Sequence, residues 1–579
     1  MIDSTTRAGS RGEADVVILG SGLAGTVLAA ALASNGARVL VFDASTHPRF
    51  AIGESTIPYT SMLTRIIAER YGVPELKWLS SFENVQSKIS PSCGIKRNFG
   101  FLYHRPGERQ NPAEFHELPL PKITYTENHF FRQDIDAWLL TLAVSYGAQV
   151  RQRVRITDFD FDDTGVTVTA QSGETWRARF VVDASGYRSP LAHKFELREE
   201  PSRLRHHARS LFTHMVDVTP YEKTVPRGFH DTHTPWSQGT LHHVFEGGWI
   251  WVIPFNNHAR ATNPLVSVGL SVDPRIYPKP DCPPDEEFRD FIAEFPDIKR
   301  QFAGARSVRE WTSTGRLQYS STQTVGYRWC LTSHAAGFID ALFSRGMTNT
   351  LEIVNALAWR LLAALRDDDF EVERFKPVQD LEQGLLNFND ALVANAYTSF
   401  QRFELWDAWV RVWSLGLRFA NFEINRAYAR YLESKDQASL DRLERLAAEG
   451  CTPDYPPARE FFLRVGQEVR EVADGRREAD AAAATISRLM READFVPQVL
   501  GLADPAIRSW VVSPPKVAQL LRWARNEAPD EIGRLVWEGL TLFIRKRLDR
   551  DEFDLAEEIK HKLAALPVVG RPLRVPTPR

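Results

Sequence analysis

The chain is poor in cysteine and carries almost no net charge. Four cysteines stand among 579 residues and none forms a C-x-x-C pair: Cys93, Cys282, Cys330 and Cys451. So few cysteines cannot supply a disulfide framework, and their spacing argues against zinc and thioredoxin-like sites. The 71 basic and 74 acidic residues leave a net charge of −3. No global field is therefore present to recruit a nucleic acid or an anionic membrane.

Long hydrophobic runs are also scarce. One uncharged run of 18 residues, 16–33, would suit a membrane span, but Gly20, Gly22 and Gly25 interrupt it. The first residues lack the apolar segment of a signal peptide. We therefore expect residues 1–14 to form a disordered leader, and the protein to be soluble and cytoplasmic, with neither membrane nor nucleic acid as a partner.

The order of predicted elements begins with a β-α-β unit. Residues 16–19 and 38–43 predict buried parallel strands, and residues 23–35 predict the helix between them. Gly36 marks the end of that helix. A right-handed crossover is the rule for such a unit.

The rest of the chain divides by composition. Residues 150–183 predict a β-meander, and residues 205–325 are rich in Thr, Val and His with Gly and Pro between. From about residue 349 onward Leu, Ala, Arg and Glu dominate with helical spacing. A length of 579 residues allows several domains at about 150 residues each.

A glycine-rich fingerprint lies at the turn of the β-α-β unit. Residues 20–25 read GSGLAG, with glycines at Gly20, Gly22 and Gly25 and with Ala24 at the start of the helix. Such glycines let the backbone approach a pyrophosphate, which the helix N-terminus attracts. Asp43 lies 21 residues past Gly22 and can accept a hydrogen bond from a ribose 2′-hydroxyl. The pattern predicts FAD or NAD rather than NADP; the alternative is a tight turn without a ligand.

Further segments favour FAD over NAD. No second G-x-G-x-x-G follows, and residues 181–186 form an apolar strand that ends in Asp-Ala-Ser-Gly, with Asp183 and Gly186. Such a strand returns the chain to the cofactor in glutathione-reductase-type flavoproteins. Arg132, four residues before Asp136, resembles another part of the same cofactor site. The alternative for Arg132 is an ion pair on a helix surface.

Three motifs resemble one family. They are GESTIP at residues 53–58, GWIWVIP at 248–254 and GFIDALFSRG at 337–346. CGIK at 93–96, TLHH at 240–243 and IPFNNH at 253–258 extend the likeness. On these motifs the chain, from about residue 14 to about 420, resembles the flavin-dependent halogenases, and most closely their phenol-halogenating branch.

The resemblance implies an α/β fold: a glutathione-reductase-like, FAD-binding Rossmann domain with an inserted mixed β-sheet substrate domain and an α-helical C-terminal domain. We expect the FAD-binding module at 15–360, its substrate-side sheet at roughly 100–140 and 205–325, and the helical domain at 361–579. The resemblance also implies that the cofactor FAD is taken up as FADH2, and that O2 and chloride or bromide are consumed. It further implies that the enzyme acts in natural-product biosynthesis. A separate NAD(P)H-dependent flavin reductase would supply FADH2 to a monomer or homodimer.

Lys96 is the lysine that the resemblance places between cofactor and substrate. In the family such a lysine passes hypohalous acid to the aromatic ring, by a hydrogen bond or as a haloamine. Phe99 and Phe101 follow it, and such neighbours would exclude water and lower its pKa. Lys88 lies in a polar setting and is expected to be solvated. The alternative for Lys96 is a lysine that extends from a strand edge into solvent.

The resemblance assigns cofactor and halide positions as well. Glu54, Ser55 and Asp340 match cofactor-side positions, and the backbone of Ser344, Arg345 and Gly346 matches the halide-binding segment. Two departures stand out. Phe343 replaces a Glu of the tryptophan halogenases, which disfavours tryptophan as substrate and leaves the lysine without that carboxylate. Ser333 and His334 replace a Gly-Asp pair that usually contacts FAD, so FAD is expected to be held more loosely.

Aromatic side chains are the remaining candidates. Trp249 and Trp251 share one face of a strand, and Trp406, Trp409 and Trp413 share one face of a helix. The predicted substrate lining is a set of aromatic residues without charge, which suits a phenol: Phe99, Phe101, Trp249, Trp251, Phe343, Trp406 and Trp409. Ordinary core packing is the alternative for the tryptophans.

The combined prediction is a halogenase that acts on a phenolic or other electron-rich aromatic substrate. Three alternatives stay open: an FAD-dependent hydroxylase, a flavoprotein of the geranylgeranyl-reductase type, and a non-catalytic flavin-binding protein. The intact Lys96 and GWIWVIP motif argue against all three, whereas Ser333 and His334 keep the non-catalytic alternative open.

Overall fold

The computed structural model describes residues 13–120, 127–435, 437–450 and 453–548. All but two residues of the predicted leader, and the end of the chain, lie outside this part. Among the described cysteines, Cys93, Cys282 and Cys330 are free thiols. No helix in these ranges is both long enough and apolar enough to cross a membrane.

The first sheet is built around the predicted β-α-β unit. Its strands run in the order β17-β18-β10-β1-β2-β7, and β8 and β9 extend it antiparallel from β10. The neighbours of β1, which are β10 and β2, are both parallel to it. The elements are β1 (Glu13–Leu19), α1 (Leu23–Ala33), β2 (Val39–Asp43), α4 (Arg132–Ser145), β7 (Gln149–Gln152), β8 (Ile156–Asp162), β9 (Gly165–Ala170), β10 (Thr175–Asp183), α5 (Pro190–Lys194), β17 (Val325–Gly326) and β18 (Trp329–Leu331).

The second sheet is mixed and is inserted between parts of the first. Its order is β15-β11-β14-β13-β12-β4-β5, with β16 beside β11. Strands β12 and β4 run parallel, and the other pairs are antiparallel. The elements are β4 (Asn98–Tyr103), β5 (Phe115–Pro119), β11 (Arg209–Val216), β12 (Thr240–Phe245), β13 (Gly248–Pro254), β14 (Val266–Val272), α6 (Pro284–Ala293), α7 (Pro296–Gln301), β15 (Arg306–Ser307) and β16 (Thr312–Ser313).

A third sheet has two strands. It consists of β3 (Gly94–Lys96) and β6 (Glu127–His129), which pair antiparallel. Helices α2 (Pro58–Tyr71) and α3 (Phe82–Asn84) precede it.

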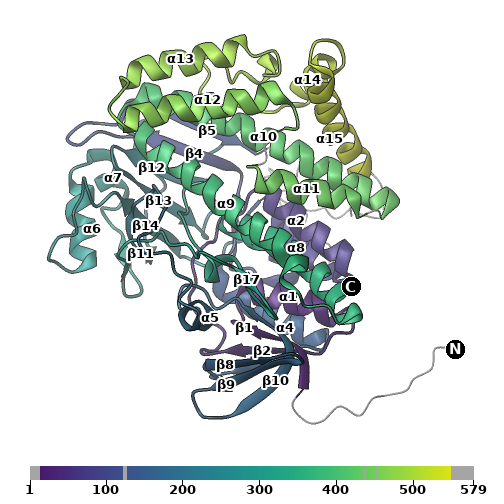
Figure 1. Cartoon of the computed structure of the whole chain (residues 1–579). Coiled ribbons are helices and arrows are strands. Elements are labelled where there is room, and N and C mark those ends of the chain that lie inside the picture. The colour runs from purple at the N-terminus through teal and green to yellow at the C-terminus, as the bar shows by residue number, and fades with distance from the viewer. Residues whose placement is uncertain (1–12, 121–126, 436, 451–452, 549–579) are drawn as a thin grey trace, which may run out of the picture.

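Helices make up most of the described chain between residues 346 and 548 (Figure 1). They are α8 (Gly346–Asp367), α9 (Val372–Ser399), α10 (Phe403–Ser434), α11 (Ala438–Ala448), α12 (Pro456–Ala473), α13 (Ala479–Glu492), α14 (Pro514–Asn526) and α15 (Asp530–Leu548). The long helix α10 packs against α11, α13 and α15, and also against α2. The fold class is therefore confirmed. The predicted boundary at residue 360 lies inside α8, which packs on α1 and α2.

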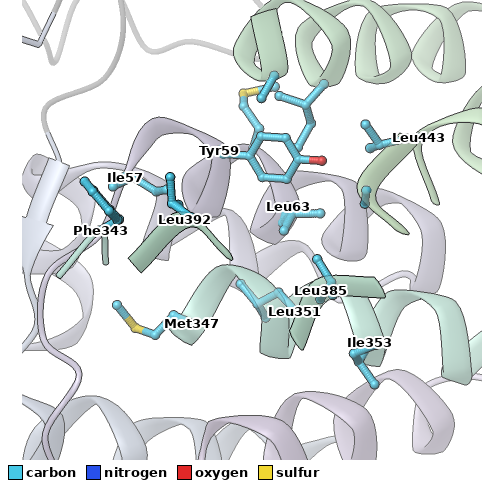
Figure 2. Close-up of a cluster of buried hydrophobic side chains, with 14 of the residues drawn as sticks. Ile57, Tyr59, Leu63, Phe343, Met347, Leu351, Ile353, Leu385, Leu392 and Leu443 are labelled. Atoms are coloured by element: carbon cyan, nitrogen blue, oxygen red, sulfur yellow. The ribbon is translucent and has the colours of Figure 1, made fainter. Parts of the chain in front are cut away.

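One hydrophobic core joins the helices to the first sheet. Figure 2 shows Tyr59 and Leu63 of α2 facing Leu351 of α8, Leu385 of α9 and Leu443 of α11. These side chains are buried. Burial of this apolar surface is what fixes the helical region on the FAD-side module.

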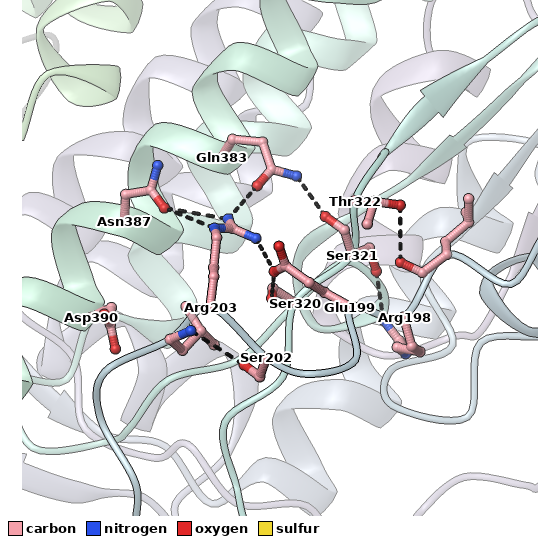
Figure 3. A network of polar contacts seen from close by, with 12 residues as sticks. Arg198, Glu199, Ser202, Arg203, Ser320, Ser321, Thr322, Gln383, Asn387 and Asp390 are labelled. Carbon is pink, nitrogen blue, oxygen red and sulfur yellow. Dashed lines mark hydrogen bonds and ion pairs between the residues drawn. The ribbon is translucent and has the colours of Figure 1, made fainter.

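Polar contacts fasten α9 to the loops beside the second sheet (Figure 3). Arg203 donates to Gln383 at 2.6 Å, and Gln383 donates to the carbonyl of Ser321 at 2.9 Å. Farther along α9, Asp390 accepts from the amide of Arg205 at 3.0 Å. Side chains of α9 thus hold the loops that contain residues 203–205 and 321.

The region beyond residue 420 also reaches the second sheet. The backbone amide of Glu117 on β5 donates to the carbonyl of Arg508 at 2.9 Å, and the backbone amide of Trp510 donates to the carbonyl of Glu117 at 3.0 Å. The segment between α13 and α14 thereby adds a short bridge to the edge strand of that sheet. The C-terminal helices are thus coupled to the sheet predicted to face the substrate.

Buried histidines beside β12 predict sensitivity to acid. His104 contacts His243 at 2.9 Å, and burial lowers the pKa of His243 to about 4. A depressed pKa means that only the unfolded chain is protonated just below pH 6.5, so stability falls as pH drops from about 6.5 toward 4. Thermal unfolding measured across this range should show a falling midpoint. His243→Gln should make that dependence less steep by the contribution of one histidine, whereas exposed His193→Gln should leave it unchanged.

Candidate active site

The glycine fingerprint brings together the two segments predicted to hold FAD. Gly20 has φ of +95°, and a Cβ there would lie 2.6 Å from the carbonyl oxygen of Ala184, in the Asp-Ala-Ser-Gly turn. A Cβ at Gly25 would collide with the carbonyl oxygen of Gly20. Gly22 differs, because no heavy atom lies within 4 Å of the position of its Cβ. The backbone at Gly22 therefore borders open space.

The N-terminus of α1 points its amides into that space. Gly22 is the N-cap, no side chain caps the helix, and the first turn holds no acidic residue. Ala24, in that turn, is partly exposed. An open cradle with uncapped amides is the arrangement that a pyrophosphate fits.

Asp43 is already engaged in hydrogen bonds. It accepts from Ser21 through both the amide, at 2.8 Å, and the hydroxyl, at 2.6 Å, from the amide of Ser45 at 2.8 Å, and from Arg49 at 2.5 Å. Burial alone would raise its pKa, but the bonds from Arg49 and Ser21 hold the pKa below its ordinary value. Its contact with a ribose stays a prediction, and would replace one of these donors.

Two of the predicted cofactor residues hold loops in shape. Asp183 is fully buried and accepts from Ser185 and Ser189, both at 2.6 Å, which shapes the turn before Gly186 (φ +83°). Arg132 pairs with Asp136 at 2.8 Å and donates to the carbonyls at residues 52 and 53, at 2.9 and 3.1 Å. Arg132 therefore anchors the start of the GESTIP loop. An ion pair on a helix surface, the alternative for Arg132, would not make these bonds to the loop.

Two further carboxylates predicted for the cofactor face the second sheet. Glu54 lies 3.4 Å from His214 of β11. Asp340 lies 3.1 Å from His206 and accepts from Ser271 of β14 at 3.4 Å. In the structure both connect the cofactor-side loops to that sheet, and their role toward FAD stays a prediction.

Lys96 ends β3 and is fully buried. Its Nζ donates to Ser55 Oγ at 2.7 Å and to the carbonyl of Thr56 at 2.8 Å, and it lies 4.2 Å from the centre of the Phe99 ring. Burial lowers the pKa of Lys96 to about 7, against an opposing effect of Glu127. The aromatic neighbours thus produce the predicted environment, and the alternative of a solvent-extended lysine is wrong. Lys88 is exposed, as expected.

Glu127 is the carboxylate that sequence reasoning missed. Glu127 on β6 lies opposite Lys96 of β3 in the strand register. Its carboxylate accepts hydrogen bonds from Thr56 Oγ1 at 2.6 Å and from Ser61 Oγ at 2.8 Å. Burial raises its pKa to about 7, although these hydroxyls favour the charged form. Phe343, in the turn before α8, supplies no carboxylate, as expected, but Glu127 supplies one from β6. No local motif marks it, because β6 is only three residues long.

The predicted halide segment is the N-terminus of α8. Arg345 is the N-cap and Gly346 the first residue; no side chain caps the helix and its first turn holds no acidic residue. Ser344 has φ of +54°, and its hydroxyl donates to Ser55 Oγ at 3.2 Å. The segment therefore lies two hydrogen bonds from the Lys96 amine, through Ser55. Its uncapped amides suit a small anion.

Aromatic rings form a continuous cluster beyond Phe99. His242, a residue of the TLHH motif to which the sequence assigned no role, stacks on Phe99 at 4.5 Å and on Phe101 at 4.6 Å. Trp413 lies 5.4 Å from Phe99 and 4.6 Å from Phe343. We call these five residues, together with Trp249 and Trp406, the aromatic cluster.

The remaining aromatic candidates lie beside this cluster. Trp249 and Trp251 are 5.4 Å apart on one face of β13, as the alternation predicts. Trp251 covers Gly269 of β14, where a Cβ would collide with the indole. Trp409 is buried on α10. All belong to the hydrophobic core, so their role toward a substrate stays a prediction.

The departure at Ser333 and His334 lies beside a buried carboxyl group. The amide of Ser333 donates to Glu382 of α9 at 3.0 Å, and burial raises the pKa of Glu382 to about 8. A carboxyl group is thus present near the position of the missing Asp, although it comes from α9. The looser hold on FAD stays a prediction.

Comparison with known protein families places the chain in a class. The tryptophan halogenase family model matches residues 108–408, and a model of an NAD(P)-binding Rossmann-like domain matches residues 18–59. The chain therefore belongs to the tryptophan halogenase family and is a flavin-dependent halogenase, with FAD as its cofactor. The resemblance found in the motifs is confirmed.

Individual relatives cover nearly the whole chain. The tetracycline 7-halogenase of Kitasatospora aureofaciens is 48% identical over 93% of this chain and 97% of its own. The monodechloroaminopyrrolnitrin halogenase PrnC of Pseudomonas fluorescens is 46% identical over 90% and 93%. The crystal structure of the halogenase PltM with phloroglucinol and FAD has a TM-score of 0.82 at 34% identity, and covers 86% of this chain and 100% of that one. The likeness thus extends past residue 420, where the sequence shows only a compatible composition.

Two glycine variants test the cradle at α1. In Gly25→Ala the new methyl would meet backbone that cannot move away, so we expect a loss of about 1–3 kcal/mol in unfolding free energy. In Gly22→Ala the methyl would enter open space, so stability should be kept while FAD affinity falls about tenfold or more. Thermal unfolding and FAD titration measure the two effects. Unchanged FAD affinity in stable Gly22→Ala would place the pyrophosphate elsewhere.

Proposed function

We propose that the chain chlorinates or brominates a phenolic or other electron-rich aromatic substrate with O2 and halide, and that Lys96 delivers the hypohalous acid. The observation that carries this proposal is the position of Lys96. A fully buried amine lies between an uncapped helix N-terminus and the aromatic cluster. A hydroxylase has no need of such a lysine.

The FAD would be held by the α1 cradle at Gly20, Gly22 and Gly25, with the Asp183 turn and the Arg132-anchored loop beside it. Reduced FAD, with O2, supplies the oxidising equivalent that converts halide into hypohalous acid. The amides at Ser344–Gly346 would hold the halide, since backbone N–H groups are not consumed by hypohalous acid. A separate NAD(P)H-dependent flavin reductase in the cytoplasm would supply FADH2, to a monomer or homodimer.

The amine of Lys96 is the group that reacts with the hypohalous acid. With a pKa of about 7, a substantial fraction of the amine is neutral at physiological pH. The neutral nitrogen can attack the halogen: an N–X bond forms, the O–X bond breaks, and the hydroxide takes a proton from nitrogen and leaves as water. The alternative is an ammonium that hydrogen-bonds the intact acid. In either route the aromatic ring then receives the halogen and loses a proton.

The aromatic cluster sets the class of substrate. It presents ring faces, and burial lowers the pKa of His242 to about 3, so that ring is neutral. A neutral aromatic substrate fits such a surface better than an amino acid, and Phe343 removes the carboxylate of tryptophan-specific relatives. The names of two relatives specify tetracycline and monodechloroaminopyrrolnitrin, and PltM is solved with phloroglucinol, a phenol. They support a role in natural-product biosynthesis.

Product analysis tests this function. The protein, FAD, a flavin reductase, NADH and a panel of phenols are incubated with chloride or bromide, and products are read by mass spectrometry. We expect a halogen isotope pattern that falls at least about 100-fold in Lys96→Ala, while FAD binding is kept. Exposed Lys88→Ala is the matched control and should halogenate normally. An added oxygen without halogen would establish the hydroxylase instead.

The pH dependence of halogenation tests the form of the amine. If the neutral amine reacts, kcat should rise as pH increases through about 7. Since the Glu127 carboxylate raises the pKa of Lys96, Glu127→Gln should move the midpoint of that rise to lower pH. A rate that instead falls through pH 7 would identify the ammonium as the active form.

A further inference from the structure

A chain of hydrogen bonds runs away from Lys96 through buried side chains. Lys96 Nζ contacts Ser55 Oγ at 2.7 Å, and Ser55 Oγ contacts Thr240 Oγ1 at 2.8 Å. Thr240 Oγ1 lies 3.0 Å from His129 Nε2, and His129 Nδ1 lies 2.8 Å from the carbonyl oxygen of Pro254. The four side chains are each less than one-tenth exposed.

The direction of every bond in this chain follows from its last member. A carbonyl can only accept, so His129 Nδ1 carries a proton and donates to Pro254. Burial lowers the pKa of His129 to about 3, so the ring is neutral and Nε2 is an acceptor. Thr240 must then donate its one proton to His129, and Ser55 must donate its own to Thr240. Ser55 is left as an acceptor toward Lys96.

A second contact agrees with this direction. Ser344, in the predicted halide segment, lies 3.2 Å from Ser55 and donates to it. Ser55 Oγ thus accepts one hydrogen bond from Ser344 and one from Lys96, and donates one to Thr240.

We propose that His129 is a positioning residue that keeps Ser55 a hydrogen-bond acceptor and so leaves the lone pair of the Lys96 amine free to receive the halogen. This inference rests on the proposed function of Lys96. A neutral amine has two N–H bonds, and both are used here, on Ser55 Oγ and on the Thr56 carbonyl. Were the chain reversed, the Ser55 hydroxyl would donate into the lone pair that must attack the halogen.

The frame around His129 fixes its place. His129 lies on β6 opposite Gly94 of β3, and bridges to Ser55 on its other side. A Cβ at Gly94 would collide with the Pro254 carbonyl, so the glycine lets the end of β13 approach. The titratable groups that interact with Lys96 are Glu127 and His129 from β6 and His242 from β12. Both histidines are neutral, so Glu127 is the titratable partner whose charge acts on the amine.

The test is the pKa of Lys96 in the flavin-free protein. It is read by NMR from lysine labelled with ¹³C at Cε, with the signal assigned through Lys96→Arg. His129→Phe and Thr240→Val each free the Ser55 proton to bond the neutral amine. We expect the pKa of Lys96 to fall by about half a unit or more in each variant. Halogenation should nevertheless slow, although more of the amine is neutral.

A double-mutant cycle separates positioning from loosening. In a Ser55→Ala background no hydroxyl can reverse, so His129→Phe should cause no further fall in the pKa. Three results would overturn the proposal: a pKa that rises toward 10.5, as entry of water would cause, an unchanged pKa, or an equal fall in the Ser55→Ala background. Should His129→Phe not fold, Thr240→Val carries the same test, because valine has the shape of threonine.

The two proposals fail in different ways. Undiminished halogenation by Lys96→Ala would overturn the proposed function and leave the titration result standing. If Lys96→Ala is inactive but the pKa of Lys96 is unchanged in His129→Phe and Thr240→Val, the positioning role alone is overturned.

Discussion

The removal of the Lys96 amine from water is the constraint on which the site depends. A buried ammonium loses its hydration, and each unit by which the pKa falls corresponds to about 1.4 kcal/mol. Two acceptors and the face of Phe99 replace part of that hydration, and Glu127 replaces part of the charge balance. The result is an amine whose pKa lies below that of a lysine in solvent, so that it loses its proton more readily. The fold must hold all of these partners at once.

The architecture supplies them from distant parts of the chain. The pair β3 and β6 carries Lys96 and Glu127. The hydroxyl groups that hold the carboxylate come from Thr56, just before α2, and from Ser61 of α2. The second sheet brings Phe99, His242 and Trp249, and α10 brings Trp406 and Trp413. The segment at Trp510 then ties the C-terminal helices to the edge of that sheet. The helical region therefore helps to shape the aromatic cluster through α10.

The sequence predicts best what local geometry decides. The fingerprint glycines, the strand before them and the one-sided tryptophans follow from backbone sterics and side-chain periodicity, and the structure agrees. The burial of Lys96 is predicted from the family resemblance together with its aromatic neighbours, because local spacing alone also fits a lysine at a strand edge. The hydrogen-bond partners could not be predicted, because Ser55 and Thr240 are 185 residues apart and Ser61 and Glu127 are 66 apart. Asp43 shows the opposite limit: its motif predicts a ribose contact, whereas the fold engages it with Arg49 and Ser21.

In the proposed function, the buried amine of Lys96 carries the halogen to the substrate. The most direct measurement treats the flavin-free protein with one equivalent of hypochlorous acid and locates chlorine on individual lysines by peptide mass spectrometry. We expect N-chlorination at Lys96 in preference to the exposed Lys88. When an accepting phenol is added, the chlorine should leave Lys96 and chlorophenol should appear. Chlorine found only on exposed lysines, or a Lys96 adduct that no phenol discharges, would contradict it.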